Sequence, residues 1–312
     1  MSTSSRPGDI RFTHRTSQLI FIYSVLVPLL AVFLVFQVWP IISLFNLSFR
    51  EWQDVLARKP SFVGLANFQR LVKDPAFWQV LGNTFKFTAL RVPIGMVLGL
   101  VFALAIDHTR HLRGLYVGAF FSPYMVSAVS MAFMFTYFFQ PQYGLFNFVL
   151  GRFGIPSQRF LLSTTQALPS IVFVDLWKNF GFTMVIFLAG LQSIPREFHE
   201  SAAVSGAGAW QTFWRITFPM LTPTTFLMLL TNVIVAMRVF VPVFVMTSLT
   251  AVSRGSLGGP LNSTNVFAVQ MYQEAFNYSD FTYAAAVGVV LFIIVFALTI
   301  LQLRTLRVRW EY

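Results

Sequence analysis

Six long apolar segments, separated by shorter polar connections, make up most of this 312-residue chain. Each is long enough to cross the hydrocarbon core of a bilayer, which takes about 20 residues in a helix. Because lipid offers no partner to backbone N–H and C=O groups, such segments are expected to be helices. We therefore predict an all-α membrane protein whose six transmembrane helices lie near Leu19–Leu44, Thr84–Ile106, Leu115–Phe139, Leu168–Leu191, Pro223–Thr247 and Tyr283–Leu303. They would form one transmembrane domain over residues 19–303, between tails at 1–18 and 304–312.

The composition supports a membrane location. Hydrophobic residues make up 56% of the chain and charged residues 11%, whereas a soluble domain carries about 25% charged residues. The net charge of +11 would suggest nucleic acid in a soluble protein. Here the basic residues lie mainly in tails and connections, without the aromatic platforms of a nucleic-acid binder. We therefore expect no nucleic-acid partner and assign the positive charge to lipid headgroups.

Lys and Arg are spread unevenly over the connections. Ten lie in the tails and in the second and fourth connections, against eight in the longer first, third and fifth connections. The first set is denser near the helix ends, where positive charge favours the cytoplasmic side. We therefore expect both termini in the cytoplasm, together with the connection between the fourth and fifth helices.

Shorter features of the sequence concern the arrangement of the helices and of the segments between them. Asn67–Leu81 and Leu145–Phe153 are predicted to lie along the membrane interface on the outer side. Gly95 and Gly99 form a G-x-x-x-G pair, which favours close contact with a neighbouring helix. Several of the predicted helices contain proline, which predicts kinks.

The connection between the fourth and fifth helices has an unusual composition. Glu197–Trp214 predicts a short helix followed by a turn, with acidic residues in its first turns, where they suit the helix dipole. Small residues would let another protein approach the backbone, and aromatic residues would anchor it; these are Ala202, Ala203, Gly206, Ala207, Gly208, Trp210, Phe213 and Trp214. From the residues alone, the segment is either a docking surface or an ordinary loop lying on the headgroups.

The stretch Glu200–Pro219 reads ESAAVSGAGAWQTFWRITFP. It closely resembles the EAA loop of bacterial ABC importer permeases, although Ser201, Ser205 and Phe218 depart from the usual pattern. In that family the loop forms a cytoplasmic helix that docks into the ATPase subunit. The resemblance implies a coupling loop over residues 196–222 that contacts the ATPase through Glu200, Ala202, Ala203, Gly206, Trp210, Ile216 and Pro219.

Two further stretches are similar to carbohydrate-importer permeases of the maltose or glycerol-phosphate type. Phe62–Thr88 contains F-x-G-L-x-N-F, D-P-x-F-W and N-T-x-x-F-T, and Gly258–Thr264 matches a GGP-x-x-S-T loop. Together with the EAA loop, the matches extend from about residue 62 to residue 291. They imply the first of the two permeases that such importers usually contain.

The fourth helix carries polar groups that suit a sugar. Asp175, Asn179 and Phe182 share one face, where a carboxylate and an amide would bind hydroxyls and the ring would cover an apolar sugar face. A charge inside a span costs about 2.5–3.5 kcal/mol, so it needs a reason. Pairing of Asp175 with Lys178 is the alternative reason. The family resemblance implies that sugar binds in the middle of the membrane, partly on this helix.

The fifth helix adds Asn232 and Arg238 as candidate substrate contacts. The guanidinium of Arg238 suits a phosphate or carboxylate. Pairing with Asp175 across the bundle, or packing at a helix seam, is the interpretation that we favour for Arg238. The candidate substrate set is therefore Asp175, Lys178, Asn179, Phe182, Asn232 and Arg238.

The resemblance implies a non-catalytic permease subunit in the bacterial inner (plasma) membrane. Its partners would be a second permease, expected to be a different chain, two cytoplasmic ATPases and an external binding protein. The sequence has no G-x-x-x-x-G-K-[ST] motif, so ATP and Mg²⁺ would bind to the ATPases and not to this chain. Histidine occurs only in tails and loops, which makes a metal site unexpected. The solute remains open among sugars, oligosaccharides, polyols and glycerol phosphate.

Two other functions fit the sequence less well. A self-sufficient secondary transporter would use Asp175 or Arg238 in ion coupling, but six helices without an internal repeat fit the inverted-repeat transporters poorly. A membrane enzyme or scaffold would need a catalytic set that the sequence does not show.

Overall fold

The computed structural model of the chain describes residues 9–52, 60–109, 111–249 and 257–305. The first half contains α1 (Asp9–Phe33), η1 (Leu34–Val38), α2 (Trp39–Ser48), β1 (Arg50–Glu51), β2 (Ser61–Phe62), α3 (Ala66–Lys73), α4 (Pro75–Asp107), α5 (Arg113–Met125), α6 (Ala128–Phe138), α7 (Leu145–Arg152) and η2 (Phe160–Leu162). The second half contains α8 (Ala167–Gln192), α9 (Arg196–Val204), α10 (Ala209–Thr212), η3 (Phe213–Thr217), α11 (Phe218–Met220), α12 (Thr222–Met237), α13 (Val241–Ser248), η4 (Pro260–Asn262), α14 (Phe267–Tyr272), η5 (Gln273–Asn277) and α15 (Phe281–Thr305).

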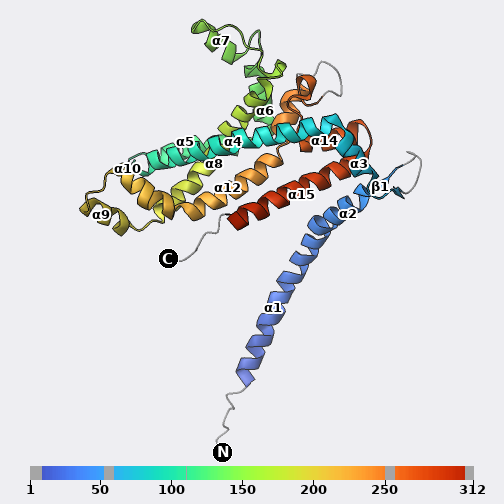
Figure 1. The fold of residues 1–312 in the computed structure, drawn as a ribbon. Coiled ribbons are helices and arrows are strands. Elements are labelled where there is room, and N and C mark those ends of the chain that lie inside the picture. Colours follow the sequence, from blue (N-terminus) through green and yellow to red (C-terminus); the bar gives the residue numbers. More distant parts are fainter. Residues whose placement is uncertain (1–8, 53–59, 110, 250–256, 306–312) are drawn as a thin grey trace, which may run out of the picture.

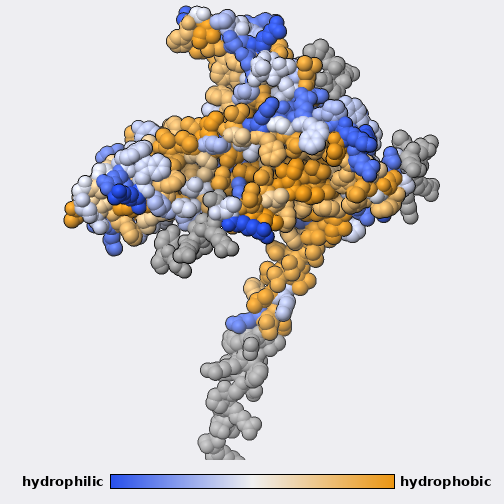
Figure 2. All heavy atoms as spheres, in the orientation of Figure 1, coloured by the Kyte–Doolittle hydropathy of each residue, from blue (hydrophilic) through white to orange (hydrophobic). Residues whose placement is uncertain are grey.

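The long helices α4, α8, α12 and α15 form an elongated bundle, with α9 and α10 at one end and α3 and α14 at the other (Figure 1). We call these the α9 end and the α14 end. The helix that begins with α1 leaves the α14 end and diverges from the bundle (Figure 1). Hydrophobic residues cover the middle of the bundle and the coloured part of α1, while hydrophilic residues gather at both ends of the bundle (Figure 2). This distribution is typical of helices that cross a membrane, and the predicted all-α fold is confirmed.

The long helices agree with the six predicted segments, and one of the kinks predicted from proline is a sharp break. Within the described residues, five helices are long and apolar enough to cross a membrane: Gln18–Ser48, Pro75–Asp107, Ala167–Gln192, Thr222–Ser248 and Phe281–Thr305. The third predicted helix, Leu115–Phe139, is divided into α5 and α6, which meet at 92°. Val126 and Ser127 have extended backbones between them. Pro123, just before the break, lacks the N–H that would continue the helical ladder.

The α14 end is held together by side chains that join segments far apart in sequence. Asp74 caps α4 by accepting a hydrogen bond from the Ala76 N–H at 2.9 Å, so Pro75 opens the long helix instead of lying within an interfacial one, as the sequence had suggested. Asp280 accepts hydrogen bonds from the Tyr283 N–H (2.9 Å) and from Arg70 (2.7 Å). Burial alone would raise the pKa of Asp280, but these donors outweigh it and hold that pKa below its ordinary value.

The carbohydrate-type motifs meet at the same end. Asn83, from N-T-x-x-F-T, donates hydrogen bonds to the carbonyls of Asn262 (2.9 Å) and Asn265 (3.1 Å) in the 258–265 loop. Asn67, from F-x-G-L-x-N-F, donates to the carbonyls of Ser48 and Arg50. These amides satisfy loop carbonyls that lipid could not, so the motifs shape this end of the bundle.

The centre of the bundle depends on close packing of α4 against α8. These two helices make the most extensive contact between elements of the described chain. A Cβ atom at Gly99 would lie 2.6 Å from Thr183 Cγ2 and 3.1 Å from the backbone nitrogen of Met184, and one at Gly95 would lie 3.3 Å from Leu176. The predicted role of the G-x-x-x-G pair in close helix contact is thus confirmed.

We expect Gly99→Ala to lower the stability of the purified protein in detergent by about 1–3 kcal/mol, because the added methyl group overpacks the α4–α8 contact. Gly118→Ala in α5 is the matched control, because a Cβ atom there meets nothing within 4 Å. Thermal unfolding followed by fluorescence would measure both. Equal melting temperatures for the two variants would show that α4 and α8 do not need this approach.

Candidate functional site

Three long helices place a buried polar cluster inside the bundle. Arg91 lies at the midpoint of α4, and its Nε donates to Asp175 Oδ2 on α8 at 2.9 Å. Its Nη1 donates to the side-chain oxygen of Asn232 on α12, and to the Asn232 carbonyl at 3.2 Å. The side chains of Arg91 and Asp175 are only 4% and 10% exposed. We call these three residues the central cluster; it links α4, α8 and α12 by one guanidinium.

The sequence suggested that Asp175 pairs with Lys178 or with Arg238. Both pairings are wrong, because its partner is Arg91. Lys178 turns away and donates to the carbonyls of Tyr124 (2.8 Å) and Val126 (2.6 Å). These carbonyls are left without helical partners where α5 ends and the chain bends into α6. Two strong acceptors of an interrupted helix are a better site for the ammonium than a carboxylate already held by Arg91.

The other predicted residues are spread over two regions. Asn179 donates to the Asp175 carbonyl one turn back in α8, at 2.8 Å. Phe182 stacks on Tyr124, with ring centroids 5.0 Å apart and an interplanar angle of 18°. Arg238 is exposed at the break between α12 and α13, and it forms no ion pair within the part of the chain that the structure describes. The structure thus brings Asp175 and Asn232 together and leaves Arg238 apart.

The loop that resembles the EAA sequence forms α9 and a defined turn. The helix begins at Arg196 and ends at Val204. Gly206 then adopts φ +73°, while its N–H donates to Ala203 and the Ala207 N–H donates to Ala202, both at 3.0 Å. This is a Schellman ending, in which glycine takes the left-handed position that an L side chain would strain. The predicted helix-then-turn is confirmed, and the spacing of the two alanines to the glycine has a structural cause.

Most of this loop presents its side chains outward. Glu200, Ala203, Gly206, Trp210 and Pro219 are exposed, Ile216 is half-buried, and Ala202 is buried. Val204 is 91% exposed and Trp210 is 76% exposed, so both apolar side chains are available for contact. Trp210 packs edge-on against Trp214, with centroids 5.6 Å apart. The α9 end thus offers a small apolar surface beside an acidic helix start.

Comparisons with known proteins agree over most of the chain. The sequence profile described as "Binding-protein-dependent transport system inner membrane component" matches residues 95–308. The chain belongs to this family. The trehalose/maltose transport system permease protein MalF of Thermococcus litoralis is 32% identical over 287 residues, which cover 92% of this chain and 94% of the relative. The sn-glycerol-3-phosphate transport system permease protein UgpA of Salmonella choleraesuis is 30% identical over 290 residues, covering 93% and 95%.

Solved structures show the same fold. A bacterial ABC transporter for import of the acidic polysaccharide alginate contains a chain that aligns with a TM-score of 0.78 at 22% identity, covering 96% of this permease and all of that chain. The alginate transporter in complex with its pentasaccharide-bound periplasmic protein aligns with a TM-score of 0.79 at 23% identity. The resemblance to ABC importer permeases is confirmed, and the family membership favours a permease subunit over a self-sufficient secondary transporter.

Arg91 is the residue that the sequence reasoning missed. It lies inside the predicted second helix, and Asp175 lies inside the fourth. An unpaired charge in lipid is costly, so an arginine and an aspartate in separate spans are expected to meet. That signal was available, but the local spacing from Asp175 to Lys178 offered a nearer partner. Among the described residues, no group of His, Cys, Asp and Glu is arranged to hold a metal ion.

We expect Asp175→Leu to destabilise the permease by about 3–5 kcal/mol, because Arg91 would remain buried without its counter-charge. Arg91→Met combined with Asp175→Leu removes both charges and should recover most of that loss, so the two effects are strongly non-additive. Thermal unfolding of the purified permease would measure the single and double variants.

The exposed pair between Arg113 and Asp107, at 3.2 Å and with side chains 36% and 35% exposed, is the control. Asp107→Leu should cost at most about 1 kcal/mol, because water screens that pair. A variant at Asp175 that is as stable as the one at Asp107 would contradict a structural role for the central cluster.

Proposed function

We propose that the chain is one of two permease subunits of an ATP-driven importer for a carbohydrate or related polar solute. The observation that carries this proposal is the exposed α9 helix with its glycine turn, on a chain whose family serves binding-protein-dependent transport. The relatives are permeases for trehalose/maltose and for glycerol 3-phosphate, which supports a small polyhydroxylated solute. The location would be the bacterial inner (plasma) membrane.

The proposed orientation places the α9 end and both termini in the cytoplasm. Arg113, Arg196 and Arg215 lie at this end, and dense positive charge next to short connections favours the cytoplasmic side. The α14 end would then face an external binding protein that delivers the solute. A second permease, different from this chain, would complete the pathway.

Each of two ATPases would bind the coupling loop of one permease. In this chain that loop comprises residues 196–222. In this chain Glu200, Ala203, Gly206 and Trp210 are exposed for contact, while Ala202 anchors α9 from its buried side. Ile216 and Pro219 lie in the helical segment that leads back into the bundle. ATP and Mg²⁺ would bind to the ATPases, and this chain would take no part in hydrolysis.

The connections of α9 give this loop a route to the central cluster. Residues 193–195 join α9 to α8, and α10, η3 and α11 join it to α12. Those two helices carry Asp175 and Asn232, which Arg91 on α4 holds together. A displacement of α9 on ATP binding would therefore tilt two members of the central cluster relative to the third. Among the candidate solute contacts, Asn179 and Phe182 follow Asp175 on α8, and Arg238 lies at the end of α12. Lys178 binds the carbonyls at the bend between α5 and α6.

We expect Gly206→Val to reduce the ATPase subunit retained by the tagged permease. A valine in the left-handed conformation costs about 1–2 kcal/mol, so the Schellman turn would open and retention should fall about five- to thirtyfold. Co-purification from the source cells, followed by quantification of the ATPase and of ATP hydrolysis, would measure the effect.

Gly154→Val is the matched control. Gly154 has φ +71° and, like Gly206, has nothing within 4 Å of an added Cβ atom, but it follows α7, away from α9. The strain is the same at both positions, so only docking distinguishes them. Undiminished ATPase retention in the Gly206 variant, with α9 altered, would refute coupling through this loop.

A further inference from the structure

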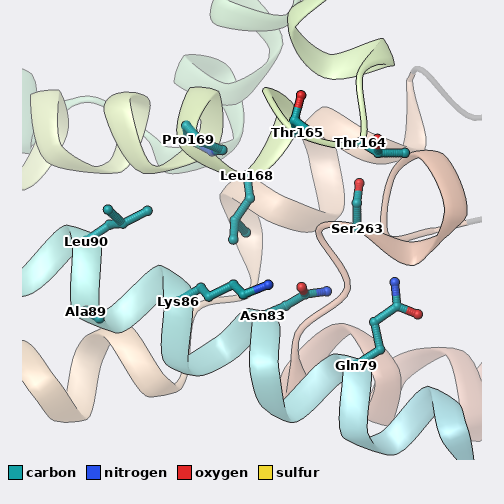
Figure 3. A pocket seen from close by; sticks show the side chains of 10 residues that line it. All are labelled: Gln79, Asn83, Lys86, Ala89, Leu90, Thr164, Thr165, Leu168, Pro169 and Ser263. Atoms are coloured by element: carbon teal, nitrogen blue, oxygen red, sulfur yellow. The ribbon is translucent and has the colours of Figure 1, made fainter.

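A cleft lined by both polar and apolar side chains lies toward the α14 end, and none of the three residues of the central cluster lines it. Figure 3 shows the side chains that do. Its volume is about 640 Å³, and it is bounded by α4, by residues 164–169 at the start of α8, and by Ser263 of the 258–265 loop. Clefts of roughly 300–1,000 Å³ accommodate small organic ligands. Its polar lining consists of Gln79, Asn83, Lys86, Thr164, Thr165 and Ser263.

One face of α4 supplies half of that lining. Gln79, Asn83 and Lys86 follow the spacing i, i+4, i+7, which aligns them along one side of the helix. The side-chain amides of Gln79 and Asn83 donate to the carbonyls of Leu261 (2.7 Å) and Asn262 (2.9 Å). Both amides thereby fix the loop that closes the cleft, and Lys86 is left as its cation.

The ammonium of Lys86 has no hydrogen bond or ion pair with any residue that the structure describes. This distinguishes it from Arg91, which binds Asp175 and Asn232, and from Lys178, which binds two carbonyls. The amine extends along α4 toward Asn83, inside the cleft (Figure 3). Ser263 also lines the cleft, and its buried Oγ has no hydrogen-bond partner within the described part of the chain.

The cleft also has an apolar side. Leu90, Leu168 and Pro169 line it beside the polar residues. An acidic sugar has the complementary chemistry: a carboxylate or phosphate for the ammonium, hydroxyls for the threonine and serine side chains, and carbon-bound hydrogens for the apolar wall. A neutral apolar ligand would leave the ammonium and Ser263 without partners, at a cost in free energy.

We propose that this cleft binds an acidic saccharide, a uronate or a sugar phosphate, through Lys86. This inference rests on the proposed function. With the α9 end in the cytoplasm, the cleft lies toward the outer side, and a solute moving inward would reach it before the central cluster. It narrows the solute to one that carries a negative charge. A lipid phosphate has the same anionic chemistry as this ligand, and the test separates the two.

The test uses the full-length permease with its co-purifying subunits in nanodiscs of neutral phosphatidylcholine. Lys86 is labelled with an amine-reactive ester, and its labelling rate is measured by mass spectrometry. D-glucuronate and glucose 1-phosphate are the probes, and D-glucose is the neutral match. We expect saturable protection of Lys86 by at least one of the two acidic probes and none by D-glucose.

Lys86→Gln should weaken binding of the protecting probe about ten- to a hundredfold in a calorimetric titration, the loss expected for a hydrogen bond to a charged group. Lys86→Arg keeps the charge and should retain most of the affinity. Lys73→Gln is the matched control, because Lys73 is an exposed lysine at the end of α3, outside the cleft. An unfolded Lys86→Gln variant would be recognised by its thermal transition, and the labelling result would still decide.

The inference is overturned if neither acidic probe protects Lys86. It is equally overturned if protection arises without sugar when anionic phosphatidylglycerol replaces phosphatidylcholine, since the cleft would then hold a lipid headgroup. Neither result touches the docking of the ATPase, which the Gly206 and Gly154 variants test separately. Conversely, loss of the coupling account would leave protection of Lys86 as a measured property of the cleft.

Discussion

The buried pair between Arg91 and Asp175 is the interaction on which the rest of the bundle depends. Both side chains are almost completely buried, and lipid offers no substitute for water, so each charge requires the other. The guanidinium uses Nε for the carboxylate and Nη1 for Asn232, which fixes three helices at one height. Close approach of α4 and α8 at Gly99 makes this possible, because a bulkier residue there would separate the helices that carry the two charges.

The same demand for satisfied polar groups explains the interruptions in the helices. Where α5 gives way to α6, two carbonyls are freed and Lys178 binds both. Where α9 ends, the Schellman turn at Gly206 satisfies the last carbonyls with backbone N–H groups. At the α14 end, the amides of Asn67 and Asn83 serve the loop carbonyls. Each of these three irregularities has its own donor, because backbone groups that leave the helical ladder need another partner.

The sequence predicts what depends on local pattern and misses what depends on contact between distant segments. Apolar length located five spans, and the alanines followed by Gly206 correctly predicted a helix that stops in a turn. The pairing of Asp175 failed because Arg91 lies 84 positions away, whereas Lys178 lies within one turn of the same helix. Proline predicted a kink in the third helix, but not a bend as large as the 92° between α5 and α6. A proline marks where a helix can break, but the angle of the bend depends on how α6 packs against α13.

The placement of the two charged sites bears on how a permease of this kind could distinguish solutes. In the central cluster the guanidinium of Arg91 already binds Asp175 and Asn232. A new anion would have to compete with Asp175 for this guanidinium. Lys86 is open, and its cleft lies closer to the α14 end, where α4 begins. An acidic solute would therefore bind first at Lys86. To move inward it would need a second cation, and Arg91 is not free while Asp175 and Asn232 bind it. Tilting α8 and α12 through α9 would loosen the hold of Asp175 and Asn232 on Arg91. The energy of ATP binding would then be used to make a second cation available in the middle of the membrane, at the moment when the path opens.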